Sequence, residues 1–446
     1  MARSPSTASN RPRLLQACVD AFRQPDVREK LFFTFAMLVV FRFLSHVPLP
    51  NVNQQALTGA FNGNSLLGFL NLFSGNALRH LSVAALGVYP YITASIVMQI
   101  LVPVVPRLTA LSKEGEQGQK RIQLYTHWMT VPLALLQGYA QLSILAQPGT
   151  SAITHFGFGS ADNILPTLAT LASVVAGTLF LVWIGELITE RGIGNGVSVI
   201  IFGGIVAGIP GLAGSNVFSA AGVAAIMLLA LIAFVLVLAI VIFNEATRRV
   251  PVQYSRSVFR GGRMYRQSGQ TYIPLKVNSA GMIPLLFAFS LMILPSFIAN
   301  YFQGSGSSTV RDLASWTKTA FNPTGVVYQL AVFFLVIVFT FFYTVIVFQQ
   351  QNVAENLQKQ GGFIPGIRPG RPTSEYINRV LFRITWAGAL FLGVVSIIPY
   401  IATRLTGVQA LTISATGMLI VVGVVIDTMK QLEAQLLMRN YEGFIR

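Results

Sequence analysis

Residues Ser65–Val105 read SLLGFLNLFSGNALRHLSVAALGVYPYITASIVMQILVPVV, and they contain two apolar elements of unequal length. The second, Leu81–Val105, is long enough to cross a bilayer, because about 20 apolar residues span the hydrocarbon as a helix. The first, Leu66–Phe73, is too short to cross and is interrupted by polar residues. Such an element either lies flat on the membrane surface or sits at membrane depth inside protein or a water-filled cavity. These residues leave both positions open.

The composition indicates an integral membrane protein. Hydrophobic residues make up 53% of the 446 residues and charged residues only 10%, whereas a soluble domain carries about 25% charged residues. The net charge of +16 fits basic cytoplasmic loops better than nucleic acid binding. Cys18 is the only cysteine, which excludes a disulfide within one chain. No apolar core of signal-peptide length precedes Lys30, so we expect no cleavage there.

Ten apolar stretches predict ten transmembrane helices and an all-α fold. They are Leu31–Val47, Leu81–Val105, Ile122–Leu145, Pro166–Ile188, Gly196–Leu212, Gly222–Phe243, Ser279–Ile298, Gly325–Phe348, Val380–Ile401 and Leu411–Met429. The first and fifth are short, which a wide cavity or local thinning of the bilayer would accommodate.

The distribution of basic residues places both termini in the cytoplasm, because that orientation puts 26 of the 31 lysines and arginines on the inner side. Five spans on each side of Ser219 then enter the membrane from opposite faces, as in an inverted repeat with a pathway between its halves. No residue-level similarity supports the repeat, so ten spans without internal symmetry remain an alternative. The expected segments are a cytoplasmic N-terminal segment 1–30, an N-terminal half 31–218 with the short element at 65–75, a C-terminal half 219–429 with cytoplasmic loops 244–276 and 349–376, and a cytoplasmic tail 430–446.

The predicted spans carry few charges, and none is an acid at mid-membrane. Arg42 and His46 lie near the outer end of the first span and Asp427 near the end of the last. Ion-coupled transporters usually place an acid or a histidine at mid-membrane, which counts against that class, although backbone carbonyls can bind sodium. Glu186 and Glu190 share a helix face, and pairing of either with Arg191 or a neighbouring loop is a simpler explanation than acid–base catalysis.

Soluble-enzyme signals are weak throughout the chain. The GIGNG turn at Gly192–Gly196 follows no predicted strand, and no GxxxxGK[ST] motif occurs. The four histidines are scattered, without an HExxH pair. We therefore expect no catalytic residues, no metal and no cofactor.

The two long cytoplasmic loops are basic and contain aromatic residues. In the second, GGFIPGIRPGRP (Gly361–Pro372) places prolines on both sides of Ile367 and Arg368, which fixes the backbone so that one guanidinium projects. This pattern favours docking of a large, acidic cytoplasmic partner. Charge that serves only to orient the chain in the membrane is the alternative.

Six long motifs occur in order along the chain: GVYPYITASIVMQ (Gly87–Gln99), KEGEQGQKRIQLYT (Lys113–Thr126), WIGELITERGIGNGVSVIIFGGIV (Trp183–Val206), IPLKVNSAGMIPLLFA (Ile273–Ala288), NLQKQGGFIPGIRPGRPTSEY (Asn356–Tyr376) and MRNYEGFIR (Met438–Arg446). In this order and topology the chain resembles the SecY family, the channel subunits of the bacterial Sec translocase. The resemblance covers nearly the whole chain except the N-terminus and the outside loops.

The resemblance implies two five-helix halves that form a clamshell around an hourglass pore. Unfolded chains would cross this pore, and apolar helices would leave it sideways into lipid. The short element is similar to the family's plug, with Leu66, Leu67, Phe69, Leu70, Leu72 and Phe73 as its apolar residues. The constriction ring carries over to Val88, Ile92, Val197, Ile201, Leu286 and Ile420. The lateral gate would lie between the second and third spans and the seventh and eighth, with Gln99 and Asn278 as its polar pair.

The resemblance also implies partners. Arg368, with Arg371 nearby, resembles the loop arginine that engages the SecA motor and the ribosome, and the segment around Arg256, Arg260 and Arg263 resembles the other docking tip. The chain departs from the family at Val88 and Val197, where isoleucine is frequent, and at Gly262–Arg263, where two arginines are common. These departures bear on the tightness of the ring and on affinity for partners.

The expected function is therefore that of a passive protein-conducting channel in the bacterial plasma membrane. SecE-like and SecG-like membrane subunits, a SecA motor or a ribosome, signal peptides, nascent chains and lipid are the expected partners. A secondary transporter with an inverted repeat is the alternative. An intramembrane enzyme would need paired catalytic residues inside the spans, and the sequence offers none.

Overall fold

The computed structural model is mostly helical. It describes residues 24–50, 52–53, 67, 70–71, 74–146, 153, 156–158, 161–213, 222–260, 263–281, 283–302, 307–323, 325–351, 353–406 and 410–442. The long helices are α2 (Pro25–Leu44), α5 (Tyr89–Val104), α7 (Glu116–Leu145), α8 (Ala161–Arg191), α9 (Gly196–Ala213), α11 (Gly222–Glu245), α12 (Ile283–Phe302), α14 (Val326–Gln351), α16 (Arg371–Thr406) and α17 (Ala410–Glu442). Shorter helices are η1 (Leu78–His80), α6 (Pro106–Lys113), α13 (Ser308–Ala320) and α15 (Val353–Lys359).

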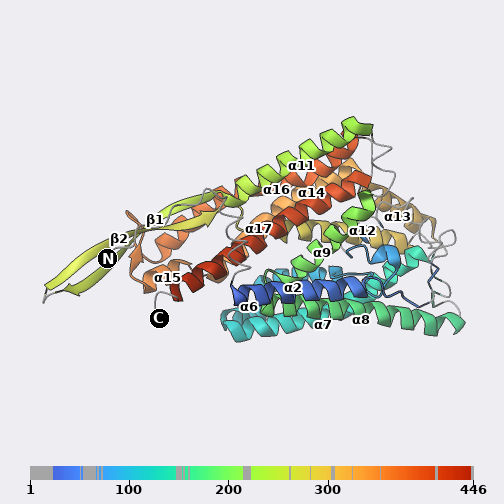
Figure 1. Ribbon diagram of the computed structural model, residues 1–446, viewed down its shortest axis with the longest axis horizontal. Coiled ribbons are helices and arrows are strands. Elements are labelled where there is room, and N and C mark those ends of the chain that lie inside the picture. The colour runs from blue at the N-terminus through green and yellow to red at the C-terminus, as the bar shows by residue number, and fades with distance from the viewer. Residues whose placement is uncertain are drawn as a thin grey trace.

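The helices form two groups (Figure 1). Helices α2, α7 and α8 lie together on one side, and α11, α14, α16 and α17 lie on the other. The two groups meet along two seams, because α12 packs against α5 and α7, and α17 packs against α9. The first group comes from residues before Ser219 and the second from residues after it, and the division into two halves stays a prediction.

Each of the ten predicted apolar stretches falls on one of the long helices. Three helices of the described chain are long and apolar enough to cross a membrane by themselves, within Asp162–Arg191, Val326–Ile346 and Arg371–Ala402. A fourth is added if α5 and α6, which meet at a 97° bend, count as one span. The count of ten spans therefore stays a prediction.

The second predicted span begins later than its hydropathy indicates. Leu81–Val88 is a series of turns, and α5 starts only at Tyr89. Leu81 and Gly87 both have positive φ, at 40° and 59°, which an α-helix does not permit. Strand-like contacts replace helical ones here, since Val83 N–H donates to Val47 O at 2.9 Å. Hydropathy alone cannot distinguish such a buried irregular segment from helix.

The first of the two loops predicted to be cytoplasmic is a β-hairpin, which the sequence did not predict. Strands β1 (Thr247–Arg260) and β2 (Arg263–Lys276) pair antiparallel along their whole length, from Thr247 opposite Lys276 to Arg260 opposite Arg263. The short strand β3 (Gly362–Phe363), from the second loop, pairs with β1 at Gln253 and Tyr254. Figure 1 shows the hairpin projecting well beyond the helices. The two predicted docking loops therefore form one sheet.

Candidate functional site

The six residues expected to form the ring come from four helices and share one hydrophobic core. Val88, Ile92, Ile201, Leu286 and Ile420 are at most 7% exposed. Val197 is half-buried and packs against the same core. The helices α5, α9, α12 and α17 come from both halves of the chain, and α5 packs against α12 and α9 against α17, so the core that contains these residues extends across both seams.

The segment before α5 positions the first ring residue by a sharp turn. Val88 is the N-cap of α5, and its backbone (φ −94°, ψ 7°) is not yet helical. Its carbonyl nevertheless accepts the Ile92 N–H at 3.1 Å, which is the first i to i+4 bond of the helix. Pro90 suits this position, because the first turn of a helix leaves its N–H groups without helical partners.

The part of the predicted plug that the structure describes packs into the same core. Leu67 and Leu70 are helical and are buried at 1% and 3% exposure. They belong to the cluster that contains Ile92 and Ile201. Burial within protein favours the second of the two positions that the sequence left open, an element enclosed at membrane depth rather than a helix on the membrane surface. Leu66, Phe69, Leu72 and Phe73 lie outside the described residues.

A contact between two glycines holds the end of this element against α9. A Cβ added to Gly75, whose φ is +65°, would lie 2.7 Å from the Gly204 Cα. A Cβ added to Gly204 would overlap the Gly75 Cα even more closely. Small residues allow such close backbone approach between membrane segments. Asn71 completes the turn, because its side-chain oxygen accepts the Arg79 N–H at 2.9 Å.

A hydrogen bond joins the two halves at the seam expected to be the lateral gate. The Tyr89 hydroxyl of α5 donates to the Ser290 carbonyl of α12 at 2.7 Å, and both residues are buried. On the same side, Gln137 of α7 donates to Thr93 of α5 at 3.3 Å. The seam is therefore polar inside an apolar core. The Tyr89–Ser290 pair was not predicted from sequence, because it joins residues 201 positions apart.

The predicted pair Gln99–Asn278 is not hydrogen-bonded in the described part of the chain. Gln99 Nε2 donates to Ser95 on its own helix at 3.3 Å. The Gln99 Oε1 and Asn278 Oδ1 atoms are both buried without a hydrogen-bond partner. Each leaves an acceptor unpaired, which costs about 1–3 kcal/mol. Their pairing stays a prediction.

The two loops predicted to be cytoplasmic share a small hydrophobic core of their own. Val250 and Val252 of β1, Leu357 of α15 and Ile364 of the second loop are buried together. Ile377 and Leu381 at the start of α16 complete this core. Residues 249–252 of β1 alternate, since Arg249 and Pro251 are exposed whereas Val250 and Val252 are buried. This alternation was the available strand signal, and the high positive charge of the segment obscured it.

Arg368 projects from this core on a rigid turn. It is exposed, whereas Ile364 nearby is buried. Its carbonyl accepts the Thr373 hydroxyl at 2.9 Å. Gly366 and Gly370 on either side have φ of +82° and +103°, a conformation that strains other residues. Arg371 is also exposed and pairs with Glu375 at 3.2 Å. Arg256, Arg260 and Arg263 belong to the strands, but their side chains lie outside the described residues.

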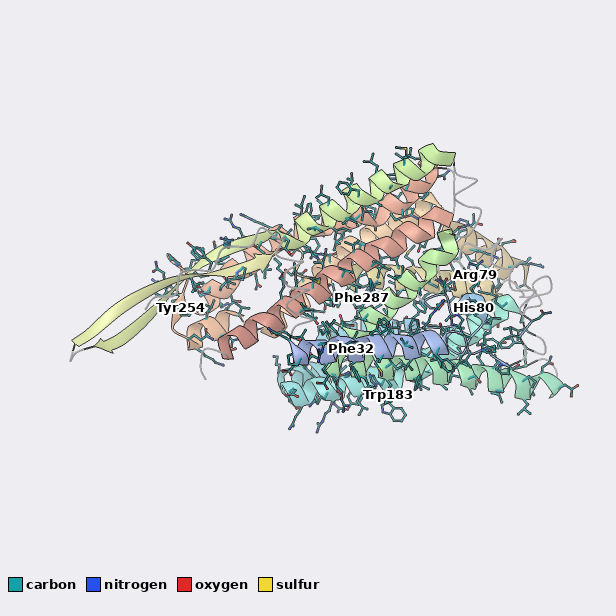
Figure 2. All side chains as sticks on the ribbon, viewed as in Figure 1. Phe32, Arg79, His80, Trp183, Tyr254 and Phe287 are labelled. Carbon is teal, nitrogen blue, oxygen red and sulfur yellow. The ribbon has the colours of Figure 1, made fainter. Side chains whose placement is uncertain are left out.

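Four basic residues cluster at the opposite end of the molecule from the hairpin. The rings of His46 and His80 lie 5.0 Å apart between centroids, and Figure 2 shows His80 and Arg79 far from Tyr254 of the hairpin. Burial, together with the nearby charges of His46, Arg42 and Arg79, lowers the pKa of His80 below 6.5. The cluster therefore disfavours a further positive charge.

Glu186 was expected to pair with Arg191 or with a neighbouring loop, and the structure instead gives it partners on the neighbouring helix α7. The Glu186 carboxylate lies 2.7 Å from His127 Nε2 and accepts a hydrogen bond from Gln123 at 2.6 Å, both residues being on α7. Tyr91 of α5 packs edge-on against His127. Glu186 thus links α8 to α7 rather than pairing with Arg191. Asp427 and Glu190 do not join it, and no three metal-ligating side chains gather anywhere in the described residues.

Comparisons with known proteins all point to the same family. The family model described as SecY matches residues 82–429. The protein translocase subunit SecY of Streptomyces scabiei is 42% identical over 448 residues, which cover 97% of this chain and 100% of that protein. The subunit of the same name from Halalkalibacterium halodurans is 42% identical over 440 residues, covering 95% and 98%.

Solved structures share the fold at lower identity. A SecY structure concerned with how the plug domain stabilises the closed channel has a TM-score of 0.60 and 17% identity, covering 93% of this chain and 96% of that one. The structure of a protein conducting channel gives 0.54 and 16%, covering 91% and 92%. Sec61 in the canine ribosome-channel complex gives 0.53 and 17%, covering 91% and 92%.

Proposed function

Because this chain belongs to the SecY family and is therefore the channel subunit of a protein translocase, we propose that its six core residues Val88, Ile92, Val197, Ile201, Leu286 and Ile420 form the seal of a passive pore. The observation that carries the proposal is the single core that these residues share with Leu67 and Leu70. A channel wide enough for a polypeptide must hold back ions when idle, and an apolar constriction does so by excluding water.

The plug closes this constriction from the outer side in the proposal. Leu67 and Leu70 belong to the same hydrophobic core as the ring residues, and the Gly75–Gly204 contact fixes the position of the segment that follows. Unfolded secretory chains displace the plug, and apolar helices leave between α5 and α7 on one side and α12 and α14 on the other. The pore is not an enzyme in this proposal and uses no cofactor, so energy comes from a partner.

Cytoplasmic partners would dock on the exposed end of the second loop and the hairpin. Canine Sec61 was solved in a complex with the ribosome. The rigid presentation of Arg368 supports docking of a ribosome or of a SecA-like motor ATPase here, because a preorganised arginine loses little entropy on binding. Both termini lie in the cytoplasm in this arrangement, and the chain sits in the plasma membrane of a bacterium as a multi-pass protein.

Small membrane subunits would cover part of the lipid-facing surface. On α2 the residues Phe32, Phe35, Val39 and Phe43 are all exposed and follow a helical repeat. We propose SecE-like and SecG-like helices as partners for such stripes. Purification in mild detergent tests this, since the proposed subunits would co-purify and a secondary transporter would come alone.

Ion conductance tests the seal directly. Replacing Ile92, Ile201 and Ile420 together with serine is expected to raise the resting conductance of reconstituted channels in planar bilayers. The matched control replaces exposed residues of the same three helices, Ile100, Val206 and Val425, with serine. Conductance of the control should equal that of the parent. A ring variant that inserts, folds and stays as tight to ions as the parent would show that the seal lies elsewhere.

A further inference from the structure

Helix α13 presents a pair of large apolar side chains that the protein does not cover. Leu313 and Trp316 are each 65% exposed, whereas Ala314 is buried. Since Leu313 and Trp316 are three residues apart, they lie on one face of the helix. Arg311, Ser315 and Lys318, spaced by four and three residues, form a separate polar face and are all exposed.

The exposed apolar surface continues onto the neighbouring helix α12, against which α13 packs. Leu291, Ile298 and Phe302 of α12 are exposed, and their spacing of seven and four residues places them in one stripe along the helix. We take this stripe to face lipid, because hydrocarbon is the surrounding that an exposed apolar helix surface meets in a bilayer unless a partner helix covers it. The apolar face of α13 therefore extends a lipid-facing surface at the point where α12 ends.

The location of α13 agrees with a position at the outer interface. Figure 1 shows α13 at the end of the molecule opposite the hairpin, which carries much of the cytoplasmic positive charge. Tryptophan is enriched at membrane–water interfaces, where its ring sits at headgroup level. Amphipathic helices with one apolar and one polar face lie in the plane of that interface.

We propose that α13 lies in the outer lipid–water interface with Leu313 and Trp316 inserted into the bilayer, so that it anchors the outer end of α12. The proposal rests on the proposed membrane orientation. Lipid is the occupant that fits, because the surface is continuous with the lipid-facing stripe of α12 and its polar face carries Arg311, Ser315 and Lys318 toward water. As α12 carries Leu286 and the acceptor of the Tyr89 hydroxyl, the anchor acts on a helix of the proposed gate.

Tryptophan fluorescence tests the insertion of α13. A variant that keeps only Trp316, with Trp128, Trp183 and Trp386 replaced by phenylalanine, is reconstituted into phosphatidylcholine vesicles with and without bromine on the acyl chains. We expect brominated lipid to remove most of the Trp316 emission and aqueous acrylamide to leave it largely unchanged. In the matched control Trp316→Phe with Ser315→Trp, the single tryptophan is on the polar face, and acrylamide should quench it instead.

Two outcomes would overturn the proposal. Quenching of Trp316 by acrylamide but not by brominated lipid would place the helix in water. Protection from both quenchers would mean that a protein partner or a second copy of the chain covers the face. A single cysteine at Ser307 in a Cys18→Ser background separates the orientation from the insertion. Labelling at Ser307 only from the cytoplasmic side would refute the membrane orientation, whatever the quenching of Trp316.

Discussion

Replacing Tyr89 with phenylalanine is expected to loosen the proposed lateral gate. The substitution removes one hydroxyl, which donates to the Ser290 carbonyl across the seam between α5 and α12 at 2.7 Å. The Ser290 carbonyl lies inside α12 and keeps its helical acceptor role, so the substitution does not leave it fully unpaired. The loss is then that of an ordinary net hydrogen bond, about 1 kcal/mol.

That loss acts on the closed state alone if opening of the gate separates α5 from α12. About 1 kcal/mol corresponds to a roughly fivefold shift of the equilibrium toward the open gate. The assay is transport of a secretory precursor with a weakened signal peptide into reconstituted vesicles, because such a precursor depends most on spontaneous opening. We expect a rate about fivefold above that of the parent when opening limits transport.

Tyr328→Phe is the matched control. Tyr328 is equally buried, on the neighbouring helix α14, but its hydroxyl has no hydrogen-bond partner in the described structure. Removing an unpaired buried hydroxyl should leave the closed state unchanged or slightly more stable. Equal transport rates in the parent and in Tyr89→Phe, with the same unfolding temperature, would refute the reasoning that this bond holds the gate closed.

Three further expectations follow from the site. Arg368→Glu should lower motor-driven transport at least about tenfold, since reversing a charge in an interface typically costs more than about 1.4 kcal/mol. Arg379→Glu makes an equal charge change at an exposed position of α16 and is the control. Unimpaired transport by Arg368→Glu would exclude docking at that residue. Gly204→Ala should raise resting conductance, because its Cβ would displace Gly75 at a cost of about 1–3 kcal/mol, whereas Gly203→Ala meets only the end of the flexible Leu38 side chain and should not. His80 should make unfolding temperature pH-dependent: its pKa in the folded protein lies below 6.5, so the unfolded chain takes up the proton first as the pH falls below 6.5, and stability falls with it. The drop should be smaller in His80→Gln, and an identical pH profile for both proteins would argue against this role of His80.

Much of the fold follows from apolar patterning, because a membrane span needs a long apolar run regardless of what it packs against. The positions of Ile92 and Ile201 in a shared core were accessible through the family resemblance. Local irregularity was not, since Leu81–Val88 is as apolar as the helix it precedes and is set apart only by its positive φ angles. The sequence did not predict the hairpin, because the high positive charge of this segment obscures its strand pattern. That pattern is the alternation around the buried residues Val250 and Val252.

Contacts between distant segments are the part that sequence patterns cannot supply. The Tyr89–Ser290 bond and the Glu186–His127 pair depend on which faces of separate helices meet. Taken singly, none of these four residues differs in sequence pattern from an ordinary residue of its helix. Only the packed structure shows that the first crosses between the halves and that the second stays within one.

The hairpin has a mechanical consequence. Strands of 14 residues reach about 46 Å at a rise of about 3.3 Å per residue. Their base is closed by the Val277–Ala246 bond of 2.9 Å, and it connects to α11 on one side and, through a short turn, to α12 on the other. A partner that pushes sideways on the tip therefore applies its force far from the base of the hairpin, where the chain is held by packing and by this hydrogen bond. The torque at the first turn of α12 grows with its distance from the tip, where the force acts. In the proposed channel, α12 is the helix whose movement would open the pore toward lipid.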